Sequence, residues 1–306
     1  MFHRSTHIIV LWLLAAIGTA AFAEECNCIS SQRGSSYRSK TPSARHVVIG
    51  TRIGTTGLTY QSDFGTFSPH IHTGLEMSYA LLWRGVGIRL GCDFAYAASN
   101  YVSTNYTDNY STIDVERDAM DVYYTIGQLH ERHNQWYLGI PLQLTLDFKH
   151  VTLNIGPKAI IALSANYRQT LQQADLRCYY PLYDVEIDNA LALATGSNTM
   201  TSTGKLISFP YAWIAIAVDG TYNIKLKNGN KIGIGLYADV AVNNHKLLKT
   251  SNLSLLSISD TKSGVPVDRL TESALYSNHA ATQTQVVRKF GYFDTGFKLV
   301  YYFVRD

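Results

Sequence analysis

Charged residues are scarce in this sequence. Only 16% of its 306 residues are Asp, Glu, Lys or Arg, whereas soluble proteins carry about 25%. Because 46% of the residues are hydrophobic, the composition excludes an intrinsically disordered chain, which combines high charge with low hydrophobicity. The formal net charge is only +3. The chain therefore lacks the basic excess with which proteins bind nucleic acid through its phosphates, and we expect no nucleic-acid partner.

Long apolar runs are also nearly absent. The one run near the amino terminus, Ile8–Ile17, follows Arg4 and precedes small residues that end at Ala23. This arrangement is typical of a secretory signal peptide, so we predict that residues 1–23 are removed during export. Beyond Ala23 no run of about 18 apolar residues remains, and the mean hydropathy is −0.05. The sequence therefore predicts no transmembrane helix.

Cysteine is rare as well, with four in the whole chain. Their irregular spacing predicts no disulfide framework, although the chain is expected to be exported. Two of them belong to a Ser- and Arg-rich leader, residues 24–44, which has no periodicity and is predicted to be an exposed tether in front of a domain at 45–306. The third is in an alternating segment and the fourth in a predicted loop. The four cysteines, whose state the sequence leaves open, are Cys26, Cys28, Cys92 and Cys178.

Alternation of apolar and polar residues dominates the sequence from Arg45 onward. A period of two recurs in eight segments, and it is the period of β-strands, whose side chains point alternately to two faces. Every charged residue within these segments falls on the polar face. If that face lines a closed interior, its charges must pair with one another. The predicted interior charges are Arg52, Glu76, Arg89, Asp93, Asp147, Lys158, Asp219, Asp239, Asp294 and Lys298.

The connections between these segments alternate in length. Those after the second, fourth and sixth segments are only a few residues long. Those after the third, fifth and seventh run through residues 99–133, 165–205 and 244–289. Short turns at one end and long loops at the other are typical of outer-membrane proteins. We therefore predict an all-β fold: an eight-stranded antiparallel up-and-down transmembrane β-barrel with short periplasmic turns and long extracellular loops.

Alternation alone does not say which face points inward, because a secreted soluble barrel also alternates and buries its apolar face. Three features favour an apolar face turned outward. The polar face is rich in glycine and poor in charge, its few charges have both signs, and aromatic residues gather at the ends of the apolar strands. Trp83 and Phe303 lie near the short turns and Trp136 near the loops, as in the aromatic girdles of membrane barrels.

Two stretches resemble a known group of proteins. The ending DTGFKLVYYF resembles the assembly signal of outer-membrane barrels, with Phe297, Leu299, Tyr301 and Phe303 as its alternating residues. The hairpin WYLGIPLQLTLDFKHVTLNIGPKAIIAL, residues 136–163, is similar to the central hairpin of small Bacteroidota-type outer-membrane barrels, which include the PorT-like proteins. The resemblance implies a Gram-negative outer membrane, with its lipid and the barrel-assembly machinery as partners. The chain departs from the pattern because three residues follow Phe303.

No catalytic site, metal site or cofactor is predicted. His130, Glu131 and His133 lack the HExxH spacing of zinc hydrolases and fall in a predicted loop. The long loops are rich in Tyr, Ser, Thr and Asn, a composition that suits binding surfaces. The alternative is that the loop tyrosines belong to strand extensions and pack hairpins together. The candidate binding residues of the loops are Tyr106, Tyr110, Tyr179 and Tyr180.

The sequence thus favours a non-enzymatic outer-membrane barrel with a closed, charge-paired interior. Its expected role is surface binding, adhesion or envelope support, with an extracellular partner. The alternative is a PorT-like accessory of a protein-secretion system, which would bind secretion components. A third option is a narrow channel, although eight strands leave an interior filled mostly by side chains.

Overall fold

The computed structural model describes residues 44–114, 116–190, 196–206, 212–243, 245–246, 254–259, 267–270 and 273–305. The predicted signal peptide and the leader up to residue 43, with Cys26 and Cys28, lie outside these residues. Within these residues all fifteen elements are β-strands, so the all-β prediction is confirmed. In the part of the chain described, no helix is long and apolar enough to cross a membrane.

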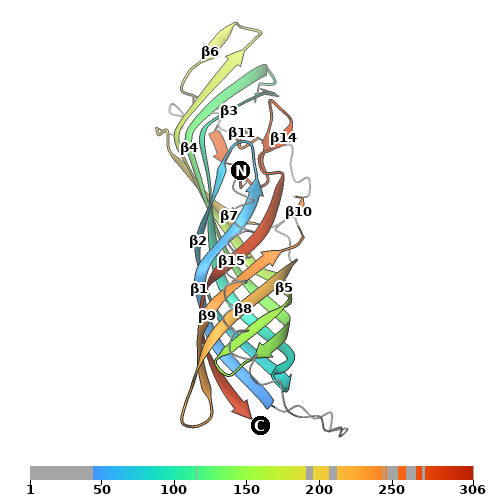
Figure 1. The fold of residues 1–306 in the computed structure, drawn as a ribbon. Coiled ribbons are helices and arrows are strands. Elements are labelled where there is room, and N and C mark those ends of the chain that lie inside the picture. The colour runs from blue at the N-terminus through green and yellow to red at the C-terminus, as the bar shows by residue number, and fades with distance from the viewer. Residues whose placement is uncertain are drawn as a thin grey trace.

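Eight strands form a closed antiparallel ring in which each strand is hydrogen-bonded to both of its neighbours (Figure 1). The ring follows the order of the chain, and its last strand pairs back with its first. All eight segments predicted from the alternation are strands of this ring. The ring strands are β1 (Ala44–Gln61), β2 (Thr66–Trp83), β3 (Val86–Ile113), β4 (Ala119–Asp147), β5 (Val151–Tyr180), β8 (Ala212–Lys225), β9 (Lys231–Ala241) and β15 (Lys289–Arg305).

Short turns join β2 to β3, β4 to β5 and β8 to β9 at one end of the ring, as predicted. The same end holds the start of β1 and the end of β15 (Figure 1). Gly85 and Gly229 both have φ near +84° in these turns. Glycine takes up this left-handed conformation without steric penalty, which explains its position there. We call this the turn end.

At the other end, β3, β4 and β5 are much longer than predicted, with 28, 29 and 30 residues. The prediction that residues 99–133 form a connecting loop is therefore wrong, because strand structure continues on both sides of a short turn at 114–118. The alternative of strand extensions is confirmed. We call residues 101–113, 119–131, 167–180, β6 (Val185–Ile187), β7 (Met200–Lys205) and the segment 273–287 the head. The remainder of the ring is the shaft.

The remaining short strands lie in the long connection before β15. They are β10 (His245–Lys246), β11 (Leu256–Ser259), β12 (Val267–Leu270), β13 (Asn278–His279) and β14 (Thr284–Gln285). The strands β10, β6 and β7 each add to an edge of the main sheet, on β15 or on β5. The strands β13 and β14 form a small hairpin within 273–287.

A row of three unpaired residues crosses the three long strands inside the head. Asn105, Gly127 and Gln173 lie opposite one another and are left out of the pairing of β3, β4 and β5, while the register on both sides of them is unchanged. Asn105 and Gln173 both have φ of +54°, which is unusual for residues other than glycine. At this row the alternation of buried and exposed side chains reverses on all three strands. Above the row, Tyr106 and Tyr124 point inward.

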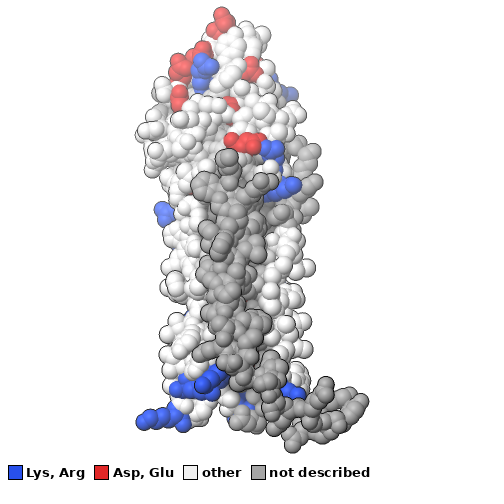
Figure 2. All heavy atoms as spheres, viewed as in Figure 1, with Lys and Arg blue, Asp and Glu red and all other residues white. Residues whose placement is uncertain are grey.

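Shaft and head bury opposite kinds of side chain. In the shaft, large apolar residues such as Ile49, Leu75 and Leu144 are exposed, while charged residues are buried. In the head, Ile126 and Leu171 are fully buried, in a core shared with segment 273–287. In Figure 2 the visible surface of the shaft carries almost no charged residues. Lys and Arg gather at the turn end, and the head carries charged residues of both signs. The predicted assignment of faces therefore holds for the shaft.

Candidate functional site

Two ion clusters cross the interior of the shaft. In the head-side quartet, Arg52 donates to Asp93 and to Asp239, at 2.8 Å each. Lys158 contacts the same two carboxylates, and its Nζ lies 2.7 Å from Oδ2 of Asp239. All four side chains are at most 5% exposed. The quartet holds two cations and two anions, so its charges cancel.

The turn-side quartet repeats this arrangement closer to the short turns. Lys298 Nζ lies 2.9 Å from Glu76 and 3.0 Å from Asp219. Arg89 lies 3.2 Å from Glu76 and 3.6 Å from Asp219, and its Nε donates to Ser78 at 2.6 Å. This quartet is also neutral. Because four different strands supply the quartet, it ties opposite walls of the ring together.

The remaining two predicted interior charges have different partners. Asp147 pairs with Lys231 at 2.8 Å near the turn end. Asp294 forms no ion pair with any described Lys or Arg, so the expected charge pairing is wrong for this residue. Its carboxylate instead accepts hydrogen bonds from the phenols of Tyr137 at 3.3 Å and Tyr237 at 3.2 Å. Hydroxyl groups thus supply the hydrogen-bond partners that a buried carboxyl group needs.

His72 completes this layer above the quartets. Its Nδ1 lies 2.6 Å from the hydroxyl of Tyr237, and its Nε2 is hydrogen-bonded to the hydroxyl of Tyr137. A bulge between Pro69 and His72 separates it from His70, which is half-buried. His72 is therefore part of a hydrogen-bonded interior layer.

These three layers close the shaft. Neutral clusters and hydrogen-bonded phenols fill the interior, and eight strands leave little room beyond their own side chains. Paired and hydrogen-bonded in this way, the buried ions avoid the several kcal/mol that an isolated buried charge costs. The arrangement ties the strands of the ring together through its interior.

In the head, two buried carboxylates hold the segment 273–287 against the inner faces of the long strands. Glu131 accepts hydrogen bonds from the backbone of Ala274 at 2.7 Å and from the Ser273 hydroxyl. It also contacts His133 at 2.6 Å and Gln169 at 2.9 Å. Glu131 is fully buried. Four partners satisfy its oxygens, so its role is to hold the segment in place.

Asp108 holds the tip of the same segment. Its two oxygens accept the backbone amides of Ala280 and Ala281 at 2.9 Å each, and the Tyr124 hydroxyl at 3.0 Å. His279 stacks on Phe64 with ring centres 4.4 Å apart. The segment therefore covers the upper end of the interior.

The predicted loop tyrosines occupy different environments. Tyr106 is 3% exposed, in the head core, and its expected role in surface binding is wrong because the alternation reverses at Asn105 and turns it inward. Burial there raises the pKa of its phenol well above the usual value. Tyr110, Tyr179 and Tyr180 are half-buried near the tip of the head.

A polar cavity of about 460 Å³ opens on the head. Asn109, Tyr123, Asp175 and Arg177 are among the residues that line it. The guanidinium of Arg177 lies 4.9 Å from the centre of the Tyr123 ring. Tyrosine, amide and charged groups of both signs around one cavity suit the binding of a polar ligand.

The histidine pair considered as a metal site lies on two faces of one strand. His130 is exposed and His133 is buried, because an odd separation on a β-strand places side chains on opposite faces. The two imidazoles therefore do not share a ligand. Among the described residues, no group of three His, Cys, Asp or Glu side chains is arranged to hold a metal ion.

The two described cysteines are free thiols in contrasting places. Cys92 is exposed on the outer face of the shaft, in the alternating segment where it was predicted. Cys178 was expected in a loop, but it lies within β5 and is buried in the head core. Burial raises the pKa of this thiol from 9 to about 11.

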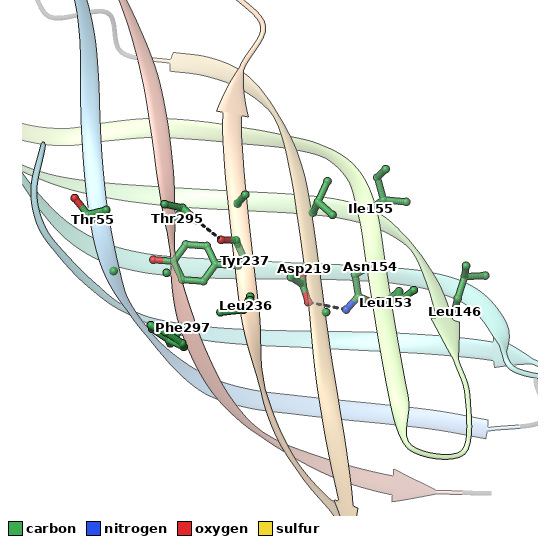
Figure 3. Close-up of a pocket in the computed structure, with 15 residues that line it drawn as sticks. Thr55, Leu146, Leu153, Asn154, Ile155, Asp219, Leu236, Tyr237, Thr295 and Phe297 are labelled. Atoms are coloured by element: carbon green, nitrogen blue, oxygen red, sulfur yellow. Dashed lines mark hydrogen bonds between the residues drawn. The ribbon is translucent and has the colours of Figure 1, made fainter. Parts of the chain in front are cut away.

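An apolar hollow of about 550 Å³ lies on the outer surface of the shaft (Figure 3). Leu153, Leu236 and Phe297 line it, together with small residues such as Gly220 and Gly296. Figure 3 also shows Asp219 and Asn154, joined by a hydrogen bond of 2.8 Å on the inner side of the sheet. The hollow arises where small outward residues leave a depression between larger ones.

The residues of the predicted assembly signal all lie on the outer face of β15. Phe297, Leu299 and Phe303 are 65%, 52% and 43% exposed. Tyr301 is half-buried and accepts a hydrogen bond from Asn230 at 2.8 Å. The structure thus presents these apolar side chains on the outside of the last strand.

No family model and no curated protein matches the chain. The resemblance to PorT-like and other small outer-membrane barrels therefore stays a prediction.

Sequence reasoning missed several residues of the interior. Lys231 was not assigned as the partner of Asp147, although it begins a strand on the polar face. Tyr137 and Tyr237 also lie on the polar faces of their segments. Each is a bulky phenol among small and charged residues, and this contrast could have indicated that they pack in the interior. Glu131 and Asp108 gave no such signal, because they bind backbone amides of a segment 143 and 172 residues away.

Proposed function

We propose that the chain is a transmembrane β-barrel of a Gram-negative outer membrane, with the shaft in the bilayer, the turn end in the periplasm and the head outside the cell. One observation carries this proposal: exposed apolar side chains surround the shaft, and its ions are buried inside. Soluble monomers rarely expose continuous apolar patches above a few hundred Å². The hydrocarbon core of a lipid bilayer is the environment in which such an apolar surface is stable.

The length of the apolar surface and the residues at its two ends support insertion of the shaft in a bilayer. On β3 the outward apolar side chains run from Val86 to Phe94, close to the 9–11 residues with which a tilted strand crosses a membrane. Trp83 and Trp136 are exposed at opposite ends of this surface, where aromatic girdles meet the headgroups. The closed ring leaves no unpaired strand edge toward lipid.

Within that proposal, the head acts as a binding surface for an extracellular partner, and the barrel does not conduct. The polar cavity beside Tyr123 and Arg177 supports the first statement. The two neutral quartets and the Asp294 layer support the second, because all of them fill the interior. The role is one of binding, adhesion or envelope support without an enzymatic step.

The proposal predicts heat-dependent migration in detergent gels. Outer-membrane fractions prepared without heating should give a faster band than boiled samples, because the closed ring stays folded in detergent until it is heated. The same purified protein should give no single-channel steps in planar bilayers. A single band at the unfolded position in both samples would contradict the barrel, and regular conductance steps would contradict its closed interior.

A further inference from the structure

Three cations lie together on the outer face where the shaft meets the head. Arg132 on β4 is directly opposite Arg168 on β5. Lys205 on β7 is opposite Asn166, two residues from Arg168 along β5. Residues two apart on a strand share a face. Arg168 and Lys205 are exposed and Arg132 is half-buried, so the three cations form one basic patch across three neighbouring strands.

Nothing in the described chain neutralises this patch. None of the three side chains forms an ion pair with a described carboxylate. Arg132 Nε donates to Asn134 Oδ1 at 3.1 Å, which leaves its other guanidinium nitrogens open to a ligand. Like charges directly opposite on paired strands destabilise a sheet. An anion bound between Arg132 and Arg168 would remove that repulsion.

The patch lies directly above the apolar surface of the shaft. Trp136 is on the same strand as Arg132, four residues closer to the turn end, and is exposed. At about 3.3 Å per residue this is about 13 Å along a tilted strand. Leu163 on β5 is also exposed below the patch. A headgroup would therefore meet the cations while its acyl chains lie against Trp136 and Leu163.

We propose that Arg132 and Arg168, assisted by Lys205, bind the phosphate of a lipid headgroup in the outer leaflet. Guanidinium groups bind phosphate oxygens in a two-pronged geometry, which makes a pair of arginines well suited to one phosphate. A soluble anion would need the cations alone, whereas a lipid also uses the apolar surface beneath them. This inference rests on the proposed function, because only insertion brings the patch to headgroup depth.

The test uses the full folded chain in a zwitterionic detergent. The probes are short-chain phosphatidic acid, phosphatidylcholine with the same acyl chains, and inorganic phosphate, each titrated to obtain a Kd. Phosphatidic acid should bind at least about tenfold more tightly than either of the others. The variant R132Q/R168Q should lose that preference, with a Kd for phosphatidic acid raised at least about tenfold.

A matched control removes two charges elsewhere. The variant R117Q/R288Q changes exposed arginines of the tip and of the segment before β15, and it should bind phosphatidic acid like the wild type. Folding of each variant is checked by heat-dependent gel migration. R168Q alone, at an exposed position, gives a second variant whose Kd should also rise if the double variant does not fold.

Three results would overturn the site. The first is that R132Q/R168Q and R168Q keep the wild-type Kd for phosphatidic acid. The second is that the control R117Q/R288Q loses as much affinity as R132Q/R168Q. The third is that inorganic phosphate binds as tightly as phosphatidic acid. The last result would assign the patch to a soluble anion. Flotation with liposomes separates this inference from the proposed function. A chain that does not float refutes insertion, whereas a floating chain with an unchanged Kd refutes only the lipid site.

Discussion

The strands β3, β4 and β5 run through both shaft and head, yet the interiors of the two regions are opposites. On β5, Lys158 points into the shaft and Ile155 points out, whereas higher up Leu171 points in and Arg168 points out. Inward and outward side chains alternate in both regions, with a register shift of one residue between them at Leu163, and the kind of side chain on each face changes. The comparison teaches that the surrounding medium decides which face is apolar: hydrocarbon around the proposed membrane span, water around the head.

The two interiors are also stabilised by different forces. The shaft interior depends on ion pairs and hydrogen bonds in neutral clusters, which are sensitive to the removal of one partner. The head interior depends on apolar burial, which contributes about 25 cal/mol per Å². Substitutions should therefore act differently in the two regions.

The largest expected effect comes from breaking a quartet. Lys158→Met leaves Asp93 and Asp239 with Arg52 as their remaining cation. Removing one partner of a buried ion pair should lower the free energy of unfolding by about 3–5 kcal/mol. Urea unfolding of the protein in lipid vesicles measures it.

The matched control for this change is an exposed ion pair. Arg288→Gln removes the partner of Asp63, where both side chains are close to half exposed or more. Its effect should stay below about 1 kcal/mol. Equal effects of the two substitutions would mean that the quartets do not hold the shaft together.

A smaller effect, and one that depends on the bilayer, is expected on the outer face. Leu144→Arg places a cation on the exposed apolar surface of the shaft and should cost about 2–4 kcal/mol in a lipid bilayer. Gln172→Arg, at an exposed position of the head, should change stability by less than about 0.5 kcal/mol. The same vesicle unfolding assay compares them, and similar costs would show that both surfaces face the same medium.

The smallest expected effect is an alkaline response confined to the head. Burial raises the pKa of the Cys178 thiol from 9 to about 11, so folding favours its neutral form. That contribution is complete below pH 9 and is lost as the pH rises through 11. In a variant with Cys26, Cys28 and Cys92 replaced by Ser, iodoacetamide should therefore modify Cys178 slowly at pH 9 and faster near pH 11. Rapid modification at pH 9 would place this thiol outside the core.

The sequence predicts the shaft well because strict alternation is a local signal. Every alternating segment is a strand, and charges such as Arg52 and Glu76 are buried on the predicted face. The head was misjudged for a local reason too. The alternation reverses at Asn105 and Gln173, which both have positive φ, so Tyr106 points inward although the sequence gives no sign of it.

The other contacts that the sequence did not predict are made mostly with residues far away along the chain. Glu131 and Asp108 bind backbone amides of residues that follow more than a hundred positions later. Backbone amides carry no sequence signature, so this part of the head could be known only from the fold. Asp294 shows the same limit, because its phenol partners come from three strands.

Fluorescence quenching by brominated lipids tests the orientation of the shaft most directly. Trp83 and Trp136 are 39% and 43% exposed on the outer face, whereas Trp213 is 1% exposed inside the ring. Variants that retain one of these tryptophans, with the others replaced by Phe, are reconstituted in lipids brominated near the headgroup end of the acyl chains. Strong quenching of Trp83 and Trp136 with little quenching of Trp213 is the predicted result. Strong quenching of Trp213 with unaffected Trp83 and Trp136 would contradict a lipid-facing apolar surface.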